Sequence, residues 1–83
     1  MTYEERSTVR AEFYRLLGSS KLSADGINRC VELIRIIGEG CGDCESAHGM
    51  EDELFVTVLQ RSRSPLAKAA LQTTKLNFSR WYA

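Results

Sequence analysis

The chain has 83 residues, of which 43% are hydrophobic and 27% charged, with one proline. This is an ordinary composition for a globular domain, and it excludes a protein that is disordered throughout. No apolar run approaches the roughly 20 residues that cross a bilayer, and residues 1–10 hold no apolar signal segment. We therefore expect a single cytoplasmic domain that does not bind a membrane. The three cysteines are too few for a disulfide scaffold and fit reduced thiols in a reducing compartment.

The net charge of zero hides an uneven distribution along the chain. Residues 1–53 hold all eleven acidic residues and six basic ones, a net charge of −5. Residues 54–83 hold five basic residues and no acidic one, a net charge of +5. Such a split favours an acidic face that meets a basic face, within the fold, between copies or with a partner.

The hydrophobic pattern predicts an all-α fold, a small bundle of three or four helices that forms one domain over residues 1–83. The first predicted helix spans residues 3–17. Thr2 and Glu5 have the spacing of a capping box at its start. Gly18 follows its last residue, as expected of a helix end.

The second predicted helix spans residues 24–37, with Ser23 as its N-cap. Apolar side chains cover more than half of its circumference between Ile27 and Ile37, an arc wider than that of an ordinary surface helix. We therefore expect neighbouring helices on two sides of it. An arc of this width also favours self-association, because three short helices do not cover it fully.

Residues 38–43 contain three glycines and are predicted to form a flexible loop. A third helix is expected to follow over residues 46–61, with Asp43 or Ser46 as its cap. Its buried face is predicted to consist of Leu54, Phe55, Val58 and Leu59.

A fourth helix is predicted over residues 65–81, with Ser64 as its N-cap and Pro65 in its first turn. Its apolar stripe follows helical spacing and consists of Ala67, Ala70, Leu71, Thr74, Phe78, Trp81 and Tyr82. The three aromatic residues of this stripe are thus expected in the core rather than on a surface that stacks on nucleic-acid bases.

A group of cysteine and histidine residues precedes and enters the third helix. Cys41, Cys44 and His48 have side chains soft enough for zinc, and Cys30 upstream offers a fourth ligand. Against a metal site, Cys30 lies in the middle of the apolar arc, where a small buried cysteine belongs as packing. We expect no cofactor, with zinc at Cys41, Cys44 and His48 as the alternative to a loop that carries incidental thiols.

Catalytic motifs are missing from the sequence. It has one histidine, no Gly-x-Ser-x-Gly elbow, no phosphate-binding loop and no spaced pair of carboxylates in an apolar setting. Cys41 or Cys44 beside His48 would be a nucleophile and a base, but they lie on a glycine-rich segment that holds them loosely. We therefore expect a protein that is not an enzyme.

Basic residues without acidic neighbours mark the last third of the chain, together with leucines that lie off the apolar stripe. The residues predicted to bind a partner are Arg61, Arg63, Lys68, Lys75, Leu76 and Arg80. The alternative is a solvated basic face that only complements the acidic first half of the same molecule.

These observations favour a small non-catalytic binding protein, an adaptor or an inhibitor, that docks on a macromolecular partner, with homodimerisation as an added expectation. A nucleic-acid-binding regulatory protein that uses the basic C-terminal face is the first alternative. A zinc-stabilised interaction module is the second.

Overall fold

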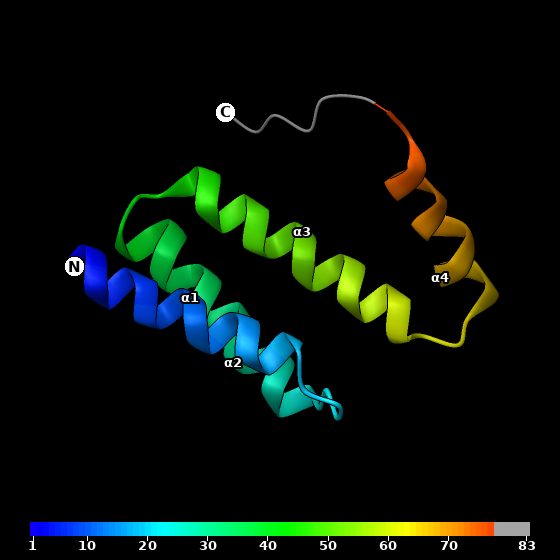
Figure 1. Ribbon diagram of the computed structural model, residues 1–83, viewed down its shortest axis with the longest axis horizontal. Coiled ribbons are helices and arrows are strands. Elements are labelled where there is room, and N and C mark those ends of the chain that lie inside the picture. The colour runs from blue at the N-terminus through cyan, green and yellow to red at the C-terminus, as the bar shows by residue number, and fades with distance from the viewer. Residues whose placement is uncertain (78–83) are drawn as a thin grey trace.

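A computed structural model describes residues 1–77 of the chain (Figure 1). Its elements are helix α1 (Tyr3–Leu17), helix α2 (Ala24–Arg35), the π-helical turn η1 (Ile36–Gly40), helix α3 (Cys44–Arg61), helix α4 (Pro65–Ala70) and the 3-10 turn η2 (Leu71–Lys75). No strand occurs in this part of the chain, so the predicted all-α class is confirmed. Among the same residues, no helix combines the length and the apolar character needed to cross a bilayer.

The helix starts follow the predicted caps. The Glu5 amide donates a hydrogen bond to the Thr2 hydroxyl (3.1 Å) and the Thr2 amide donates one to the Glu5 carboxylate, which completes the capping box. The Ser23 hydroxyl accepts from the amide of Gly26 at the start of α2 (3.0 Å). These side chains satisfy amides that have no partner within the helix, which fixes where each helix begins.

The glycine-rich segment differs from the predicted loop. The second helix does not stop at residue 37 but continues as η1 to Gly40, where the Cys41 amide donates to the Ile36 carbonyl (3.0 Å). Burial of Ile37, which has no exposed surface, outweighs the entropic cost of ordering the glycines. The chain then reverses at Gly42, whose φ of +69° is favourable for glycine alone.

The third helix begins at Cys44, two residues earlier than predicted. Asp43 supplies the cap, since its carboxylate accepts a hydrogen bond from the Ser46 amide (3.2 Å). Hydrogen bonding from the Ser46 hydroxyl, and then from this amide, lowers the pKa of Asp43. The cap is therefore a carboxylate at neutral pH, which suits the positive end of a helix dipole.

The fourth helix is shorter than the predicted span of residues 65–81. It ends at Ala70 and continues only as η2 to Lys75. The Thr74 hydroxyl donates to the Leu71 carbonyl (2.7 Å), a side-chain bond that competes with helical pairing. Of the stripe predicted for this helix, only Ala67 is buried among the described residues, since Leu71 is half-buried and Ala70 and Thr74 are exposed. Phe78, Trp81 and Tyr82 lie outside the described residues.

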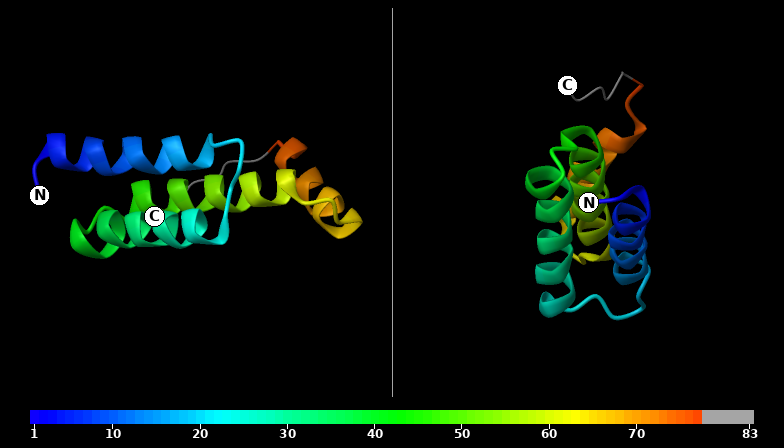
Figure 2. Two further views of the ribbon diagram at one scale, coloured as in Figure 1. Left: turned by 90° about the horizontal axis from the view of Figure 1, so that it is seen from below. Right: turned by 90° about the vertical axis from the view of Figure 1, so that its left-hand side faces the viewer.

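The core lies where α2 meets α1 and α3 (Figure 2), so the expectation that the second helix has neighbours on two sides is met. Its side chains come from all three helices and from η1: Phe13, Leu17, Cys30, Leu33, Ile37, Met50 and Leu54. Cys30 is fully buried among them, as expected of a packing residue. Burial raises the pKa of its thiol and keeps it protonated.

A bidentate ion pair fixes α2 to α1. The Arg29 guanidinium donates from Nε to Glu12 Oε2 (2.6 Å) and from a terminal nitrogen to Glu12 Oε1 (3.0 Å). These hydrogen bonds lower the pKa of Glu12 and raise the pKa of Arg29. The contribution of the pair to stability is therefore present at neutral pH and is lost as the pH falls through the lowered pKa of Glu12.

Leu33 and Val31 make a matched pair of positions on α2, since Leu33 has no exposed surface and Val31 is 53% exposed. We expect Leu33→Ala to lower the free energy of unfolding by about 3 kcal/mol, because it leaves a cavity at the centre of the core. Val31→Ala should change it by less than about 0.5 kcal/mol. Urea denaturation followed by circular dichroism measures both, and equal effects would contradict this packing.

Candidate functional site

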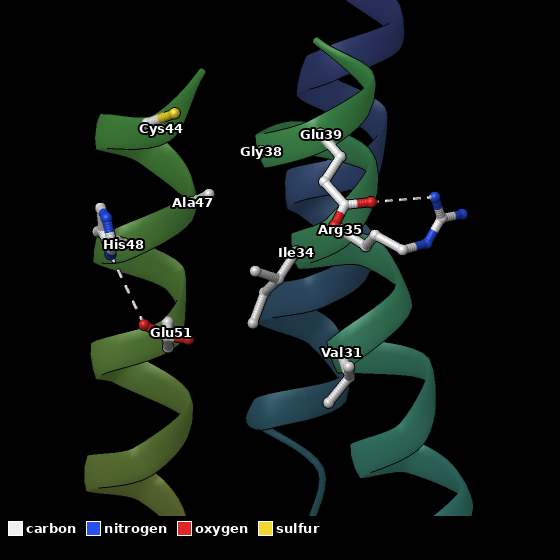
Figure 3. A pocket seen from close by; sticks show the side chains of 9 residues that line it. All are labelled: Val31, Ile34, Arg35, Gly38, Glu39, Cys44, Ala47, His48 and Glu51. Carbon is white, nitrogen blue, oxygen red and sulfur yellow. Dashed lines mark ion pairs between the residues drawn. The ribbon is translucent and has the colours of Figure 1, made fainter. Parts of the chain in front are cut away.

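An open groove of about 540 Å³ runs between α2 and α3 (Figure 3). Seen from its open side, α1 lies behind α2, so the groove faces away from the helix that covers the core. Its apolar wall is formed by Val31 and Ile34 on α2 and by Ala47 on α3. Its polar margin consists of Arg35, Glu39, Cys44, His48 and Glu51.

Small residues bring α2 and α3 close together at one end of the groove. A Cβ atom built on Gly38 would lie only 3.1 Å from the Cβ of Ala47. Two helices can approach closely where small residues lie at their contact, and they lie farther apart where the side chains between them are longer. The groove is therefore a built feature of the packing between these two helices.

Apolar surface continues along the seam beyond the groove. Phe55 is 56% exposed and Val58 is 37% exposed; at positions i+4 and i+7 from Glu51 they lie on the same face of α3 as the groove margin. Val58 and Ile27 then line a second hollow of about 480 Å³ at the other end of the seam. We call this surface the apolar strip, and its members are Ile27, Val31, Ile34, Ala47, Phe55 and Val58.

Phe55 and Val58 correct one prediction, since both were expected in the buried face of the third helix together with Leu54. Only Leu54 is buried there. The physical reason is the position of α1, which packs on the opposite side of the α2–α3 seam and leaves this side open.

Ion pairs surround the groove on both margins. On α2, Arg35 donates to the Glu32 carboxylate (2.9 Å from Nε) and lies 3.7 Å from that of Glu39. On α3, His48 Nδ1 lies 3.6 Å from a Glu51 carboxylate oxygen. Hydrogen bonding from Arg35 lowers the pKa of Glu32. Of these groups, the carboxylates of Glu39 and Glu51 and the guanidinium of Arg35 line the groove, so carboxylates outnumber guanidinium groups at its margin.

The cysteine and histidine residues predicted as zinc ligands lie in different surroundings. Cys44 and His48 line the groove on successive turns of α3, whereas the Cys41 thiol contacts the Met1 sulfur (3.5 Å). Cys30 is in the core. Within residues 1–77, no group of three or more His, Cys, Asp or Glu side chains is placed to hold a metal ion.

The predicted partner-binding residues divide into two groups. Arg61 donates hydrogen bonds to the carbonyls of Leu17 (2.8 Å) and Ser19, so it closes the C-terminal end of α1. Arg63, Lys68, Lys75 and Leu76 are exposed after α3, and Arg80 lies outside the described residues. We call residues 63–77 the basic arm.

The basic arm also presents apolar side chains. Leu66 is 81% exposed and Leu76 is 56% exposed, while Ala67 is buried and holds α4 against α3. Of the predicted residues, therefore, Arg61 has a structural role at the end of α1, whereas Arg63, Lys68 and Lys75 have exposed side chains.

Sequence reasoning missed the apolar strip, although one signal for it was present. The apolar arc of residues 27–37 was recognised as wider than its neighbours cover, and Val31 lies in the uncovered part of that arc. Nothing in the sequence indicates which face of α3 borders this uncovered apolar surface, because that depends on the direction in which α1 crosses α2.

No protein-family model matches the chain, and searches of curated proteins and of solved structures likewise found no match. The groove, the apolar strip and the basic arm are the surface features of residues 1–77 with the chemistry of a binding site. Their chemistry is apolar contact flanked by charge, which is typical of surfaces that bind other macromolecules.

Arg61→Ala should lower the free energy of unfolding by about 1 kcal/mol, because the last carbonyls of α1 lose their donor in a partly exposed setting. Arg63→Ala is the matched control, an exposed arginine two residues away, and should change stability by less than about 0.5 kcal/mol. Thermal unfolding of the two variants compares them directly. A larger loss in the Arg63 variant would contradict the structural role of Arg61.

Proposed function

We propose that this chain is a small non-catalytic binding protein, an adaptor or an inhibitor in the cytoplasm, that docks on a protein partner. Its framework is a small bundle of α1, α2 and α3, to which α4 is attached through Ala67. The observation that supports this proposal best is the apolar strip, which leaves Val31 and Phe55 more than half exposed beside an open groove. Contiguous apolar surface with a charged margin is the usual mark of a protein-binding site.

The shape of the groove suits the ridge of an amphipathic helix. It lies between two packed helices, is apolar along its wall and carries charge only at its margins. Helix-in-groove recognition uses side chains spaced three and four residues apart, which insert between the two helices of the receptor. Each aliphatic side chain fully buried in this way contributes roughly 1.5–3 kcal/mol.

The groove lacks the preorganised, water-excluding arrangement of side chains that catalysis requires. Cys44, His48 and Glu51 share one face of α3 in the order of a nucleophile, a base and an acid, but the side chains of His48 and Glu51 are about half exposed. Covalent catalysis depends on preorganised groups in a site that excludes water. An open apolar groove supports binding better than it supports chemistry.

The proposal is tested by capturing proteins from the source cell with the tagged chain. We expect Val31→Ser together with Phe55→Ser to weaken capture of the partner at least about tenfold, because two exposed apolar contacts are lost. Tyr3→Ser is the matched control, since Tyr3 is 76% exposed on α1, away from the groove. Circular dichroism confirms that each variant is folded. Equal capture by the groove variant and the wild type would contradict the proposal.

A nucleic-acid-binding function is the second candidate, and the basic arm favours it. Arg63, Lys68 and Lys75 are exposed, and no acidic residue occurs within residues 54–77. Cations that stand free of carboxylates attract phosphate through release of bound counterions. We expect contacts with phosphate to dominate this binding, so that it depends little on base sequence.

Fluorescence anisotropy with labelled duplex DNA tests this second function. If it is correct, binding at about 50 mM salt should weaken steeply as salt is added, and Lys68→Glu with Lys75→Glu should abolish it. Lys21→Glu, on the turn between α1 and α2, is the control and should lose little affinity. Absence of binding by the wild type at low salt would remove this candidate.

A further inference from the structure

Two surfaces of this molecule are complementary in both apolarity and charge. The groove offers an apolar wall and a margin that holds two carboxylates, those of Glu39 and Glu51, beside one guanidinium, that of Arg35. The basic arm offers exposed apolar side chains among cations and has no acidic residue. A basic amphipathic segment is the ligand that such a groove fits, and this chain itself supplies one.

The exposed side of the basic arm has the form that the groove needs. Leu66, Ala69 and Ala70 are exposed on α4, whereas Ala67 on its other side is buried against α3. Lys68 and Lys75 are exposed in the same segment, close in sequence to these apolar residues. The arm can therefore dock Leu66 into a second surface while Ala67 keeps its own contact with α3.

The arm of one molecule does not lie at that molecule's own groove. The groove is lined by Cys44, Ala47, His48 and Glu51 in the first half of α3, whereas α4 follows the last residue of α3 and lies at the opposite end of that helix (Figure 1). Two molecules with antiparallel α3 helices bring each arm beside the other's groove. This arrangement has two-fold symmetry and closes on itself.

A direct contact between two grooves is less favourable than this arrangement. It would oppose two margins that each hold two carboxylates and one guanidinium, and like charges across an interface destabilise it. Contact between groove and arm opposes carboxylates and ammonium groups instead. Charge therefore selects the arm, rather than a second groove, as the occupant.

We propose that a second copy of this chain occupies the groove, with its basic arm seated on the apolar strip and the exchange made reciprocally in a two-fold dimer. Leu66 inserts beside Val31 and Ile34, and Lys68 and Lys75 lie over Glu39 and Glu51. This inference rests on the proposed function, because it takes the groove as a protein-binding site and names its partner.

Charge-reversal variants of the groove and of the arm test their pairing. Sedimentation equilibrium at about 1–100 µM chain measures the dimer fraction of each variant. The groove variant is Glu39→Lys with Glu51→Lys, and the arm variant is Lys68→Glu with Lys75→Glu. Each variant alone opposes like charges at both contacts, so its dimerisation should weaken at least about tenfold. In an equimolar mixture both contacts are again between opposite charges, and dimerisation should return to near the wild-type level.

Further measurements separate this pairing from a general effect of charge. Glu4→Lys with Glu53→Lys makes the same change in net charge away from the groove and should dimerise like the wild type. Leu66→Ala changes no charge, leaves the core intact and should weaken dimerisation. Added salt should weaken the wild-type dimer, because exposed charges are screened within about 3 Å at 1 M. If a double variant fails to fold, Glu51→Lys and Lys68→Glu replace the pairs in the same mixing scheme.

A wild-type chain that stays monomeric across the concentration range would overturn this inference, as would a mixture that does not recover dimerisation. A monomer that still captures a cellular protein, with loss of capture in the variant of Val31 and Phe55, would overturn the dimer alone and leave the proposed function in place. Conversely, a dimer unaffected by the changes at Val31 and Phe55 would overturn the assignment of the groove as the binding site.

Discussion

The packing of α2 between α1 and α3 is the interaction on which the other features of the structure depend. Leu33 and Cys30 lose all exposed surface there, in a core that also includes Phe13 from α1 and Met50 from α3. Two neighbours cover only part of the apolar arc of α2. The same hydrophobic surface that holds the helices together thus leaves a groove on the side away from α1, so the core and the proposed binding site share one helix.

Acidic and basic residues are segregated along the sequence, and they are also segregated in the fold. Glu39 and Glu51 line the groove, whereas Arg63, Lys68 and Lys75 belong to the basic arm, which follows the opposite end of α3. Among residues 1–77, no ion pair joins the groove to the basic arm, and Arg61 at that end contacts backbone carbonyls instead. In the proposed complex, the charge of the arm would both attract and orient the second molecule.

Local chemistry made part of this structure predictable. The caps at Thr2 and Ser23 each accept a hydrogen bond from an amide three residues later in the chain, so the sequence alone places those helix starts. The burial of Cys30 follows from its position in the helical pattern of apolar residues. Long-range contacts were not predictable in the same way. Arg61 binds carbonyls more than 40 residues away, and the exposure of Phe55 depends on which side of α3 lacks a neighbour. The helical course of residues 38–40 depends on the burial of Ile37, which overrides the weak helix propensity of glycine.

The missing side chain at position 38 sets the spacing of the two helices that form the groove. With Ala47 as its neighbour, Gly38 leaves no room for even one additional methyl group unless α3 moves outward by a few tenths of an ångström. An alanine at position 38 would increase the distance between the two helices at this end of the seam. The size of residue 38 at this half-buried crossing thereby limits which side chains can enter the groove.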